Sequence, residues 1–308
     1  MNEFDYISYL KENENSLTYE KMNEYIRSLV FHNPVLRTGV MGKSILGKSL
    51  DVLTLGEGER TYIFVASHHA MEWITSLILL RFIGELCERA SKREQEFGVD
   101  LSRALANARF VFVPMLNPDG VDLQIRGIEA GGILSERLRK MNGGDDFSHW
   151  QANARGVDLN HNYDAGFDEY KKLEAEYGIN GGAPTRFSGE YPESEPECRA
   201  MCNLIRALSP DVIYTFHTQG EEIFYTSGDC VLDESLRIGK LLSEKSGYAL
   251  SRPEGLASYG GLTDWALTKM KIPSFTIECG LGKNPLPPSD ADKIYEKIRE
   301  MLFISLTL

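Results

Sequence analysis

A histidine and a glutamate that could share a metal ion occur three residues apart in the segment 68–73 (HHAMEW). The segment follows a short apolar run at 61–66 and precedes a longer one at 74–86, so it joins a predicted strand to a predicted helix. Residues three apart at the start of a helix point the same way, which brings His69 and Glu72 together. An imidazole and a carboxylate in this arrangement form half of a zinc site of the two-histidine, one-glutamate kind.

The donors that this half-site lacks follow two other predicted strands. His217 comes directly after the strand at 211–216, and Glu278 ends the strand at 274–277. Because ligands collect beyond the carboxyl ends of the strands in α/β sheets, these side chains are expected at one edge. We therefore predict one Zn²⁺ ion bound by His69, Glu72 and His217, with a fourth position open for water. Glu278 would act as general base, taking a proton from that water, whose pKa falls to roughly 7, and passing it to the leaving amine.

Each of these residues also has an ordinary explanation. A histidine and a glutamate three apart occur by chance on many helices, and a histidine that ends a strand is more often a hydrogen-bonded polar group. Glu278 could be half of a salt bridge. The metal site is favoured because all four side chains are predicted at the same sheet edge. The adjacent His68 is excluded, since it points away if His69 points inward.

The elements that position these residues alternate along the chain, which predicts an α/β fold with a mixed, mostly parallel sheet covered by helices on both faces. Helices are predicted at 18–31, 72–93, 193–208, 234–246, 263–270 and 290–303. Strands are predicted at 37–41, 49–55, 61–66, 109–114, 211–216, 223–225 and 274–277. Asn117-Pro118-Asp119-Gly120 is predicted to be a turn. Two long excursions, 127–150 with a short helical pattern at 134–141, and 168–191, are of a length typical of lids or substrate walls.

Composition narrows the class of protein. The 308 residues carry a formal net charge of -12 with 42% hydrophobic and 25% charged residues, which argues against a nucleic-acid partner and an anionic membrane surface. The five scattered cysteines favour reduced thiols. With no signal peptide and no apolar run of membrane-spanning length in the sequence, we predict a cytoplasmic protein. The sequence makes no prediction about the oligomeric state.

Six segments, in this order, resemble the landmarks of the zinc carboxypeptidase family. They are HHAMEWIT, NPDGVD, GVDLNHNYDAGF, HTQGEEIFY, GGLTDW and FTIECG. The resemblance runs from about Thr18 to the C-terminus and implies a single α/β domain over 1–308 with a mixed, twisted eight-stranded sheet, residues 1–17 being an N-terminal extension. It also implies the zinc ligands and the general base named above. Asp158 matches a carboxylate that orients the first ligand histidine.

One departure from the family concerns the substrate. Carboxypeptidases of this family have Asn-Arg where this chain has Asn160-His161, and that arginine grips the terminal carboxylate of the substrate. Histidine lacks the forked geometry and is only partly charged at neutral pH, so ordinary C-terminal recognition is not expected. The segments around GVDLNHNY and FSGEYPESEPE are similar to the γ-D-glutamyl-diamino acid peptidases, which cut cell-wall peptides. The resemblance implies that Asn160 and His161 contact the diamino acid on the leaving side.

Two other family positions are replaced. The arginine that stabilises the transition state aligns with Gln151, which leaves Arg155 and Arg126 as basic candidates for steadying the oxyanion. Arg155 could equally be a surface ion-pair partner. The mobile tyrosine of the family falls near Leu256. Tyr259 could reach the substrate instead, or could simply form part of a pocket wall.

These features predict a zinc metallopeptidase that hydrolyses an amide bond in murein peptides, with γ-D-glutamyl-meso-diaminopimelate as the expected bond. An N-acyl amino acid deacylase on the same scaffold is the first alternative, and the two long excursions, which can wall an extended cleft, favour a peptide over it. An ordinary carboxypeptidase and a non-catalytic binding module are further alternatives. The binding module is disfavoured because all four residues of the zinc and base constellation are present.

Overall fold

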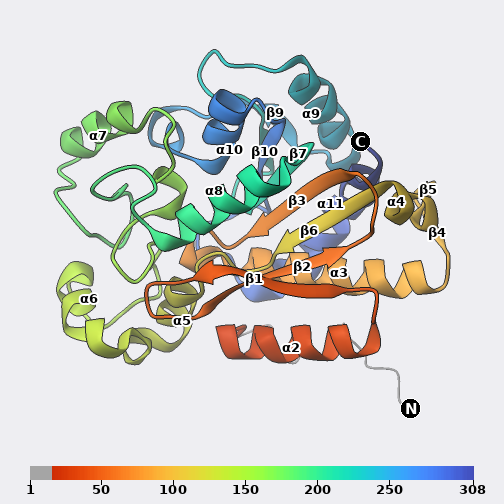
Figure 1. Ribbon diagram of the computed structural model, residues 1–308. Coiled ribbons are helices and arrows are strands. Elements are labelled where there is room, and N and C mark those ends of the chain that lie inside the picture. The colour runs from red at the N-terminus through yellow and green to blue at the C-terminus, as the bar shows by residue number, and fades with distance from the viewer. Residues whose placement is uncertain (1–15) are drawn as a thin grey trace.

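The computed structural model describes residues 16–308 (Figure 1). The predicted extension, 1–17, lies outside the described residues except for Ser16 and Leu17. The helices are α2 Tyr19–His32, α3 Ile74–Ser91, α4 Leu101–Asn107, α5 Pro118–Arg126, α6 Ser135–Asn142, α7 Phe167–Glu176, α8 Pro196–Leu208, α9 Asp233–Ser246, α10 Leu262–Trp265 and α11 Ala291–Ile304. The strands are β1 Arg37–Lys43, β2 Ser49–Leu55, β3 Arg60–Ala66, β4 Gln95–Glu96, β5 Val99–Asp100, β6 Ala108–Val113, β7 Val212–His217, β8 Glu222–Phe224, β9 Ala249–Ser251 and β10 Ser274–Glu278.

Eight of these strands form one mixed sheet in the order β1-β2-β6-β3-β7-β10-β8-β9, which confirms the predicted fold class. The central strands β6, β3, β7 and β10 are parallel to their neighbours within that block. Antiparallel pairs join β1 to β2, β2 to β6 and β10 to β8. The three strands that carry or precede the predicted site, β3, β7 and β10, are therefore adjacent and end at the same edge.

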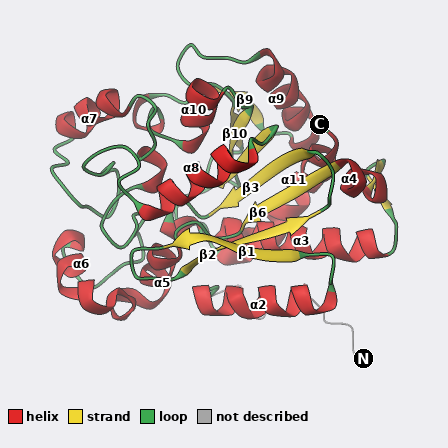
Figure 2. Cartoon of the chain, viewed as in Figure 1, coloured by secondary structure: helices red, strands yellow, loops and turns green. Residues whose placement is uncertain are grey.

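Alternate side chains of the central strands enter different cores, because successive residues of a strand point to opposite faces of the sheet. One face packs against α2, α3, α9 and α11, and its aromatic layer includes Phe64, whose ring lies 5.2 Å from Phe112 and 4.9 Å from Tyr214. The other face packs against α8 and α10 (Figure 2). His217 and Glu278 occupy positions that alternate with the α3/α11 face, so they project toward the α8/α10 side.

The first excursion, 127–150, is a folded unit with its own small core. Trp150, Phe147 and Leu138 are buried there together with Ala70, which belongs to the predicted metal segment. The amide of Ala70 also donates to the carbonyl of Gln151 over 2.9 Å. The excursion thus supports the turn that carries two of the predicted ligands.

One predicted turn is wrong. Asn117 caps helix α5, its side chain accepting a hydrogen bond from the amide of Gly120 over 3.0 Å, and Pro118 is the first helical residue. Asn-Pro followed by Asp-Gly is compatible with a turn, but asparagine at the N-cap and proline at the first position are equally signals of a helix start.

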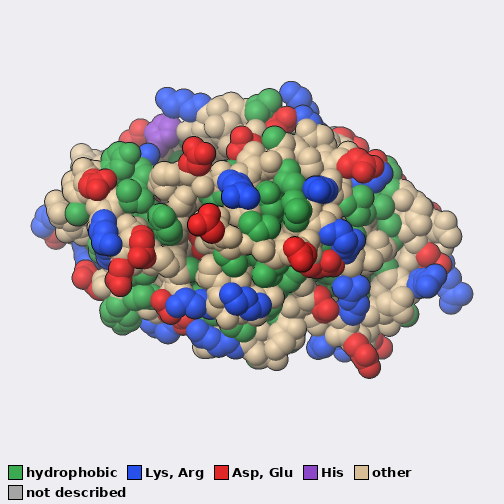
Figure 3. Space-filling view, turned by 90° about the horizontal axis from the view of Figure 1, so that it is seen from above, with side chains coloured by type: hydrophobic (Ala, Val, Ile, Leu, Met, Phe, Trp, Pro, Cys, Tyr) green, Lys and Arg blue, Asp and Glu red, His purple; other side chains and the backbone are tan. Residues whose placement is uncertain are grey.

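Three other elements differ from the prediction. Helix α4 and strand β9 were not predicted, and the second excursion contains helix α7. The helix expected from Glu72 begins at Ile74 instead, after a 3-10 turn at Ala70–Glu72. None of the helices within residues 16–308 is both long and apolar enough to cross a bilayer. On the face seen in Figure 3, acidic and basic side chains are interspersed without a continuous patch of one sign.

Candidate metal centre and active site

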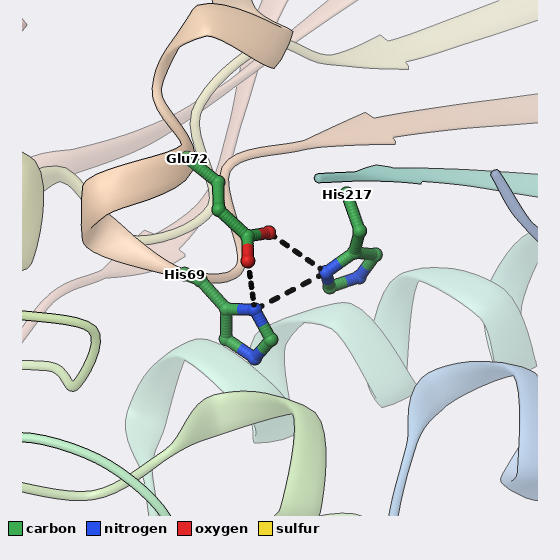
Figure 4. Close-up of side chains that lie close together, drawn as sticks. All are labelled: His69, Glu72 and His217. Carbon is green, nitrogen blue, oxygen red and sulfur yellow. Dashed lines mark hydrogen bonds and ion pairs between the residues drawn. The ribbon is translucent and has the colours of Figure 1, made fainter. Parts of the chain in front are cut away.

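The structure brings the three predicted ligands together (Figure 4). His69 precedes the 3-10 turn, Glu72 ends it, and His217 is the last residue of β7. Nδ1 of His69 lies 3.0 Å from Oε1 of Glu72, and Nδ1 of His217 lies 3.1 Å from Oε2. The two Nδ1 atoms are 3.3 Å apart. Residues 145 to 148 positions apart in the sequence thus point one donor atom each at a common centre.

This donor set fits a zinc ion. Two imidazole nitrogens and a carboxylate are ligands that zinc prefers, and three protein ligands leave a coordination position for water or substrate. Glu72 and His217 are buried, so the carboxylate needs a compensating positive charge. Burial acts to raise the pKa of Glu72, but His69 and His217 outweigh it and lower the pKa to about 2. The carboxylate is therefore ionised and available to a cation.

Asp158 fixes the orientation of His69. Its Oδ1 lies 3.1 Å from Nε2 of His69, so the ring donates through Nε2 and turns Nδ1 toward Glu72. Asp158 is fully buried and also accepts bonds from the amides of Asn160 and Arg186, each over 3.2 Å. Although burial acts to raise the pKa of Asp158, the opposing effects of His69 and His161 hold it well below its usual range. The geometry matches the orienting role that the resemblance implied.

Glu72 is held by two residues that were not predicted. The amide of Thr218 donates to Oε2 of Glu72 over 3.3 Å, and Nδ2 of Asn284 donates to Oε1 over 3.3 Å. Asn284 and Thr218 also bind each other: Nδ2 donates to the carbonyl of Thr218 and the Thr218 hydroxyl donates to Oδ1, both over 2.7 Å. Single polar residues in loops carry no periodic signal, so no sequence pattern singled them out.

The predicted general base, Glu278, lies beside the metal centre. It pairs in register with His217 on the parallel strand β7, and the amide of Cys279 donates to the carbonyl of His217 over 2.8 Å. Burial, followed by the negative charge of Glu72, raises the pKa of Glu278 well above its usual range. A bound cation would oppose this effect, because positive charge favours the ionised carboxylate.

Asn160 and His161 line a small pocket next to Glu278. Nδ1 of His161 donates to the carbonyl of Tyr259 over 2.8 Å, and its ring stacks on Tyr170 with centroids 3.9 Å apart and planes 11° apart. Burial lowers the pKa of His161. The ring is thus fixed by two neighbours, of which Tyr170 was not predicted.

The remaining predicted substrate residues have other partners. Tyr259 is 36% exposed, and its ring covers Gly166, where an added Cβ would lie 2.5 Å from it. Arg155 places its Nε 3.4 Å from Oε2 of the buried Glu195, so the ion-pair alternative has direct support. Arg126 is exposed at the end of α5. Substrate contact by any of the three stays a prediction.

His68 takes no part in the donor set. It is fully buried, its Nε2 lies 3.2 Å from the hydroxyl of Tyr163, and its ring stacks 5.2 Å from that of His217. It serves as a wall behind the ligand from β7.

Comparisons with known proteins agree with this geometry. The family described as zinc carboxypeptidase (peptidase M14) matches residues 22–301. The chain is 31% identical over 300 residues to γ-D-glutamyl-L-diamino acid endopeptidase 1 of Lysinibacillus sphaericus, an alignment that covers 97% of this chain and 74% of that protein. It is 29% identical over 152 residues to murein peptide amidase A of Escherichia coli K12, covering 48% and 55%. The structure of bovine thrombin-activatable fibrinolysis inhibitor has the same fold, with a TM-score of 0.71 at 19% identity over 96% of this chain and 98% of that one. The chain belongs to the zinc carboxypeptidase family and is a zinc-dependent metallopeptidase.

Proposed function

We propose that this enzyme hydrolyses the amide bond between γ-D-glutamate and a diamino acid in cell-wall peptides. The observation that carries the hydrolase assignment is the convergence of His69, Glu72 and His217 beside Glu278. The substrate class is supported by the relative named as a γ-D-glutamyl-L-diamino acid endopeptidase, whose likeness covers almost the whole chain, and by the murein peptide amidase.

His69, Glu72 and His217 would hold one zinc ion, which when bound polarises the scissile carbonyl and makes water a stronger acid. Glu278 accepts the proton of the attacking water and donates it to the departing nitrogen. Its place at the carboxyl end of β10, in register with His217, sets it next to both the water and the pocket that receives the leaving residue. Asp158 keeps the His69 ring turned so that Nδ1 remains available.

The leaving-side pocket supports a substrate other than an ordinary C-terminal peptide. Within residues 16–308, no lysine or arginine lies among the side chains that line it, so no guanidinium or ammonium is present to hold a terminal carboxylate. Its volume is about 70 Å³. An apolar cavity of roughly 150 Å³ holds benzene, so this pocket is too small for an aromatic leaving residue.

The test is cleavage of L-alanyl-γ-D-glutamyl-meso-diaminopimelate by the zinc-loaded enzyme, followed by mass spectrometry of the products. The same peptide with an α-linked glutamate and an N-acetyl amino acid serve as comparison substrates. We expect cleavage at the γ-D-glutamyl bond only. Preferred release of acetate from the acylated amino acid would favour the deacylase and overturn the proposal.

The Glu278→Gln variant tests the base. We expect a loss of turnover of at least about a hundred-fold, within the usual range for general acid–base groups. Metal analysis of the same variant should still find one zinc per chain, because Glu278 is not a ligand. Substantial activity in a zinc-loaded Glu278→Gln protein would exclude this carboxylate as the base.

A further inference from the structure

The pocket beside Glu278 is assembled from four elements that are distant in sequence. The turn 159–161 forms one wall, β8 and β10 form the floor, and α10 closes the far side (Figure 1). Its polar lining comprises Asn160, His161, Thr226, Thr263, Asp264, Thr276 and Glu278. The hydrogen bonds of these groups determine what kind of ligand the pocket can accept.

His161 presents an acceptor. The carbonyl of Tyr259 can only accept a hydrogen bond, so Nδ1 of His161 must carry a proton. The buried ring stacks on Tyr170, and Nε2 makes no hydrogen bond with any described residue. In the neutral imidazole this second nitrogen is an acceptor, and it needs a donor from a ligand.

Two further groups in the pocket favour a donor ligand. Asp264 is buried, and one of its oxygens accepts the amide of Gly261 over 3.1 Å. Thr226 is only 1% exposed, and its Oγ1 has no hydrogen-bond partner among the described residues. A buried hydroxyl without a partner carries a cost in free energy that a ligand could remove.

Donors are few in the same pocket. Asn160 accepts the amide of Leu262 through Oδ1 over 3.2 Å, which leaves its Nδ2 for a ligand oxygen. Besides this amide and the hydroxyls, no other side-chain donor from residues 16–308 lines the pocket, and no cationic residue does. The pocket therefore offers a carboxylate, an imidazole acceptor and an unpartnered hydroxyl against one amide donor.

We propose that this pocket binds a protonated amine on the side chain of the departing residue, with Asp264, Nε2 of His161 and Oγ1 of Thr226 as its acceptors. The inference rests on the proposed function for the identity of the leaving residue, a diamino acid, and assigns the residues that recognise its second amine. Asn160 then serves the carboxylate of the same amino acid. An amino acid of equal length without the second amine leaves three acceptors unpaired, which is a strong basis for discrimination.

The cap of α10 is the ordinary role of Asp264, since its carboxylate accepts the N-cap amide. That role requires one oxygen, which asparagine also supplies. Recognition of an ammonium requires the negative charge, which asparagine lacks. Asp264→Asn therefore separates the two roles within one side chain.

The experiment is calorimetric titration of the zinc-loaded protein with meso-diaminopimelate and with L-2-aminopimelate, which differ only in the distal amine. We expect diaminopimelate to bind about ten-fold more tightly or better, the range for hydrogen bonds to charged groups. Asp264→Asn should abolish most of this preference, and Thr226→Val should reduce it about three-fold. Asp229→Asn, an exposed carboxylate nearby in the chain, is the control and should leave the preference unchanged.

Equal affinities of the wild-type protein for the two ligands, or no measurable binding of diaminopimelate, would overturn the proposal. So would an undiminished preference in Asp264→Asn. If that variant does not fold, Thr226→Val decides, because it removes only an unpartnered hydroxyl. Both ligands are free amino acids, so failure here is distinguishable from failure to cut the γ-D-glutamyl bond.

Discussion

Gln151 donates a hydrogen bond from Nε2 to Oδ2 of Asp158 over 2.7 Å, while the other oxygen of Asp158 faces His69. Oε1 of Gln151 in turn accepts the hydroxyl of Thr185 over 2.9 Å. Both ends of the amide are therefore engaged inside the protein. At the position where the family carries its transition-state arginine, this chain has a residue that positions a zinc ligand through Asp158.

Replacement of Gln151 by leucine should weaken zinc binding more than it slows turnover. Loss of the bond to Asp158 loosens the acceptor that orients His69, and outer partners of this kind contribute about ten-fold to a hundred-fold in metal affinity. We expect a loss near the lower end in a competition titration with a chelator, and kcat within about three-fold at saturating zinc. Gln95→Leu, at an exposed position in β4, is the control. Unchanged zinc affinity combined with a large fall in kcat would instead place Gln151 against the substrate.

Asn284 should matter for the metal ligand on the opposite side. Asn284→Ala removes the bonds to Glu72 and to Thr218, so the carboxylate loses one brace and the 218–220 loop loses its link to the segment after β10. We expect zinc affinity to fall by about ten-fold or more.

Thr218→Val is the matched variant for Asn284, because it removes only the hydroxyl bond and retains the amide that donates to Glu72. Its zinc affinity should fall by less. Equal zinc affinities of Asn284→Ala and the wild-type protein would show that the bond to Glu72 does not support the site.

The sequence was sufficient for the residues that carry local or strand-end signals. The three-residue spacing placed His69 beside Glu72, and the ends of two apolar strands placed His217 and Glu278 at the same edge. The braces of the site were not predictable in this way. Asn284 is 212 residues from Glu72, and only the three-dimensional path of the chain brings these two side chains into contact.

The same limit applies to the leaving-side pocket and to some helices. Thr226 lacks a hydrogen-bond partner only because the surrounding elements offer none, which no sequence pattern records. The short helix α4 follows two residues of strand, and α7 lies inside a polar excursion. Tertiary packing decides such segments more than intrinsic propensity does.

Arg155 tests whether a basic residue next to the site serves substrate or stability. Its ion pair is to Glu195, which is buried and also accepts from Nδ2 of Asn153 over 2.7 Å. Arg155→Ala leaves that carboxylate without its cation. Because the guanidinium is 42% exposed, we expect a loss of only about 1 kcal/mol, seen as a lower Tm in calorimetry. A fall in kcat/KM with an unchanged Tm would support substrate contact.

Glu197 should make stability depend on pH. It is fully buried in α8, and burial, followed by the negative charges of Asp119 and Glu195, raises its pKa to about 8. The folded protein therefore keeps this carboxyl protonated at pH 7, whereas the unfolded chain, with a pKa near 4.5, releases the proton. Unfolding thus loses a proton between these two values, and the contribution of Glu197 to stability falls as pH rises from about 4.5 to about 8.

Glu197→Gln removes the ionisable group and retains an oxygen for the amide of Ile45, which donates to Oε1 over 3.2 Å. At pH 8 the variant should be more stable than the wild-type protein by on the order of 1–3 kcal/mol, since each unit of pKa shift corresponds to about 1.4 kcal/mol. At pH 5 the two should be nearly equal. Tm measured at several pH values between 5 and 8 checks this, with Glu57→Gln, whose side chain is 84% exposed, as control. Parallel Tm profiles for Glu197→Gln and the wild-type protein would mean that Glu197 is ionised in the folded state, paired with Lys48 or another cation near Asp119.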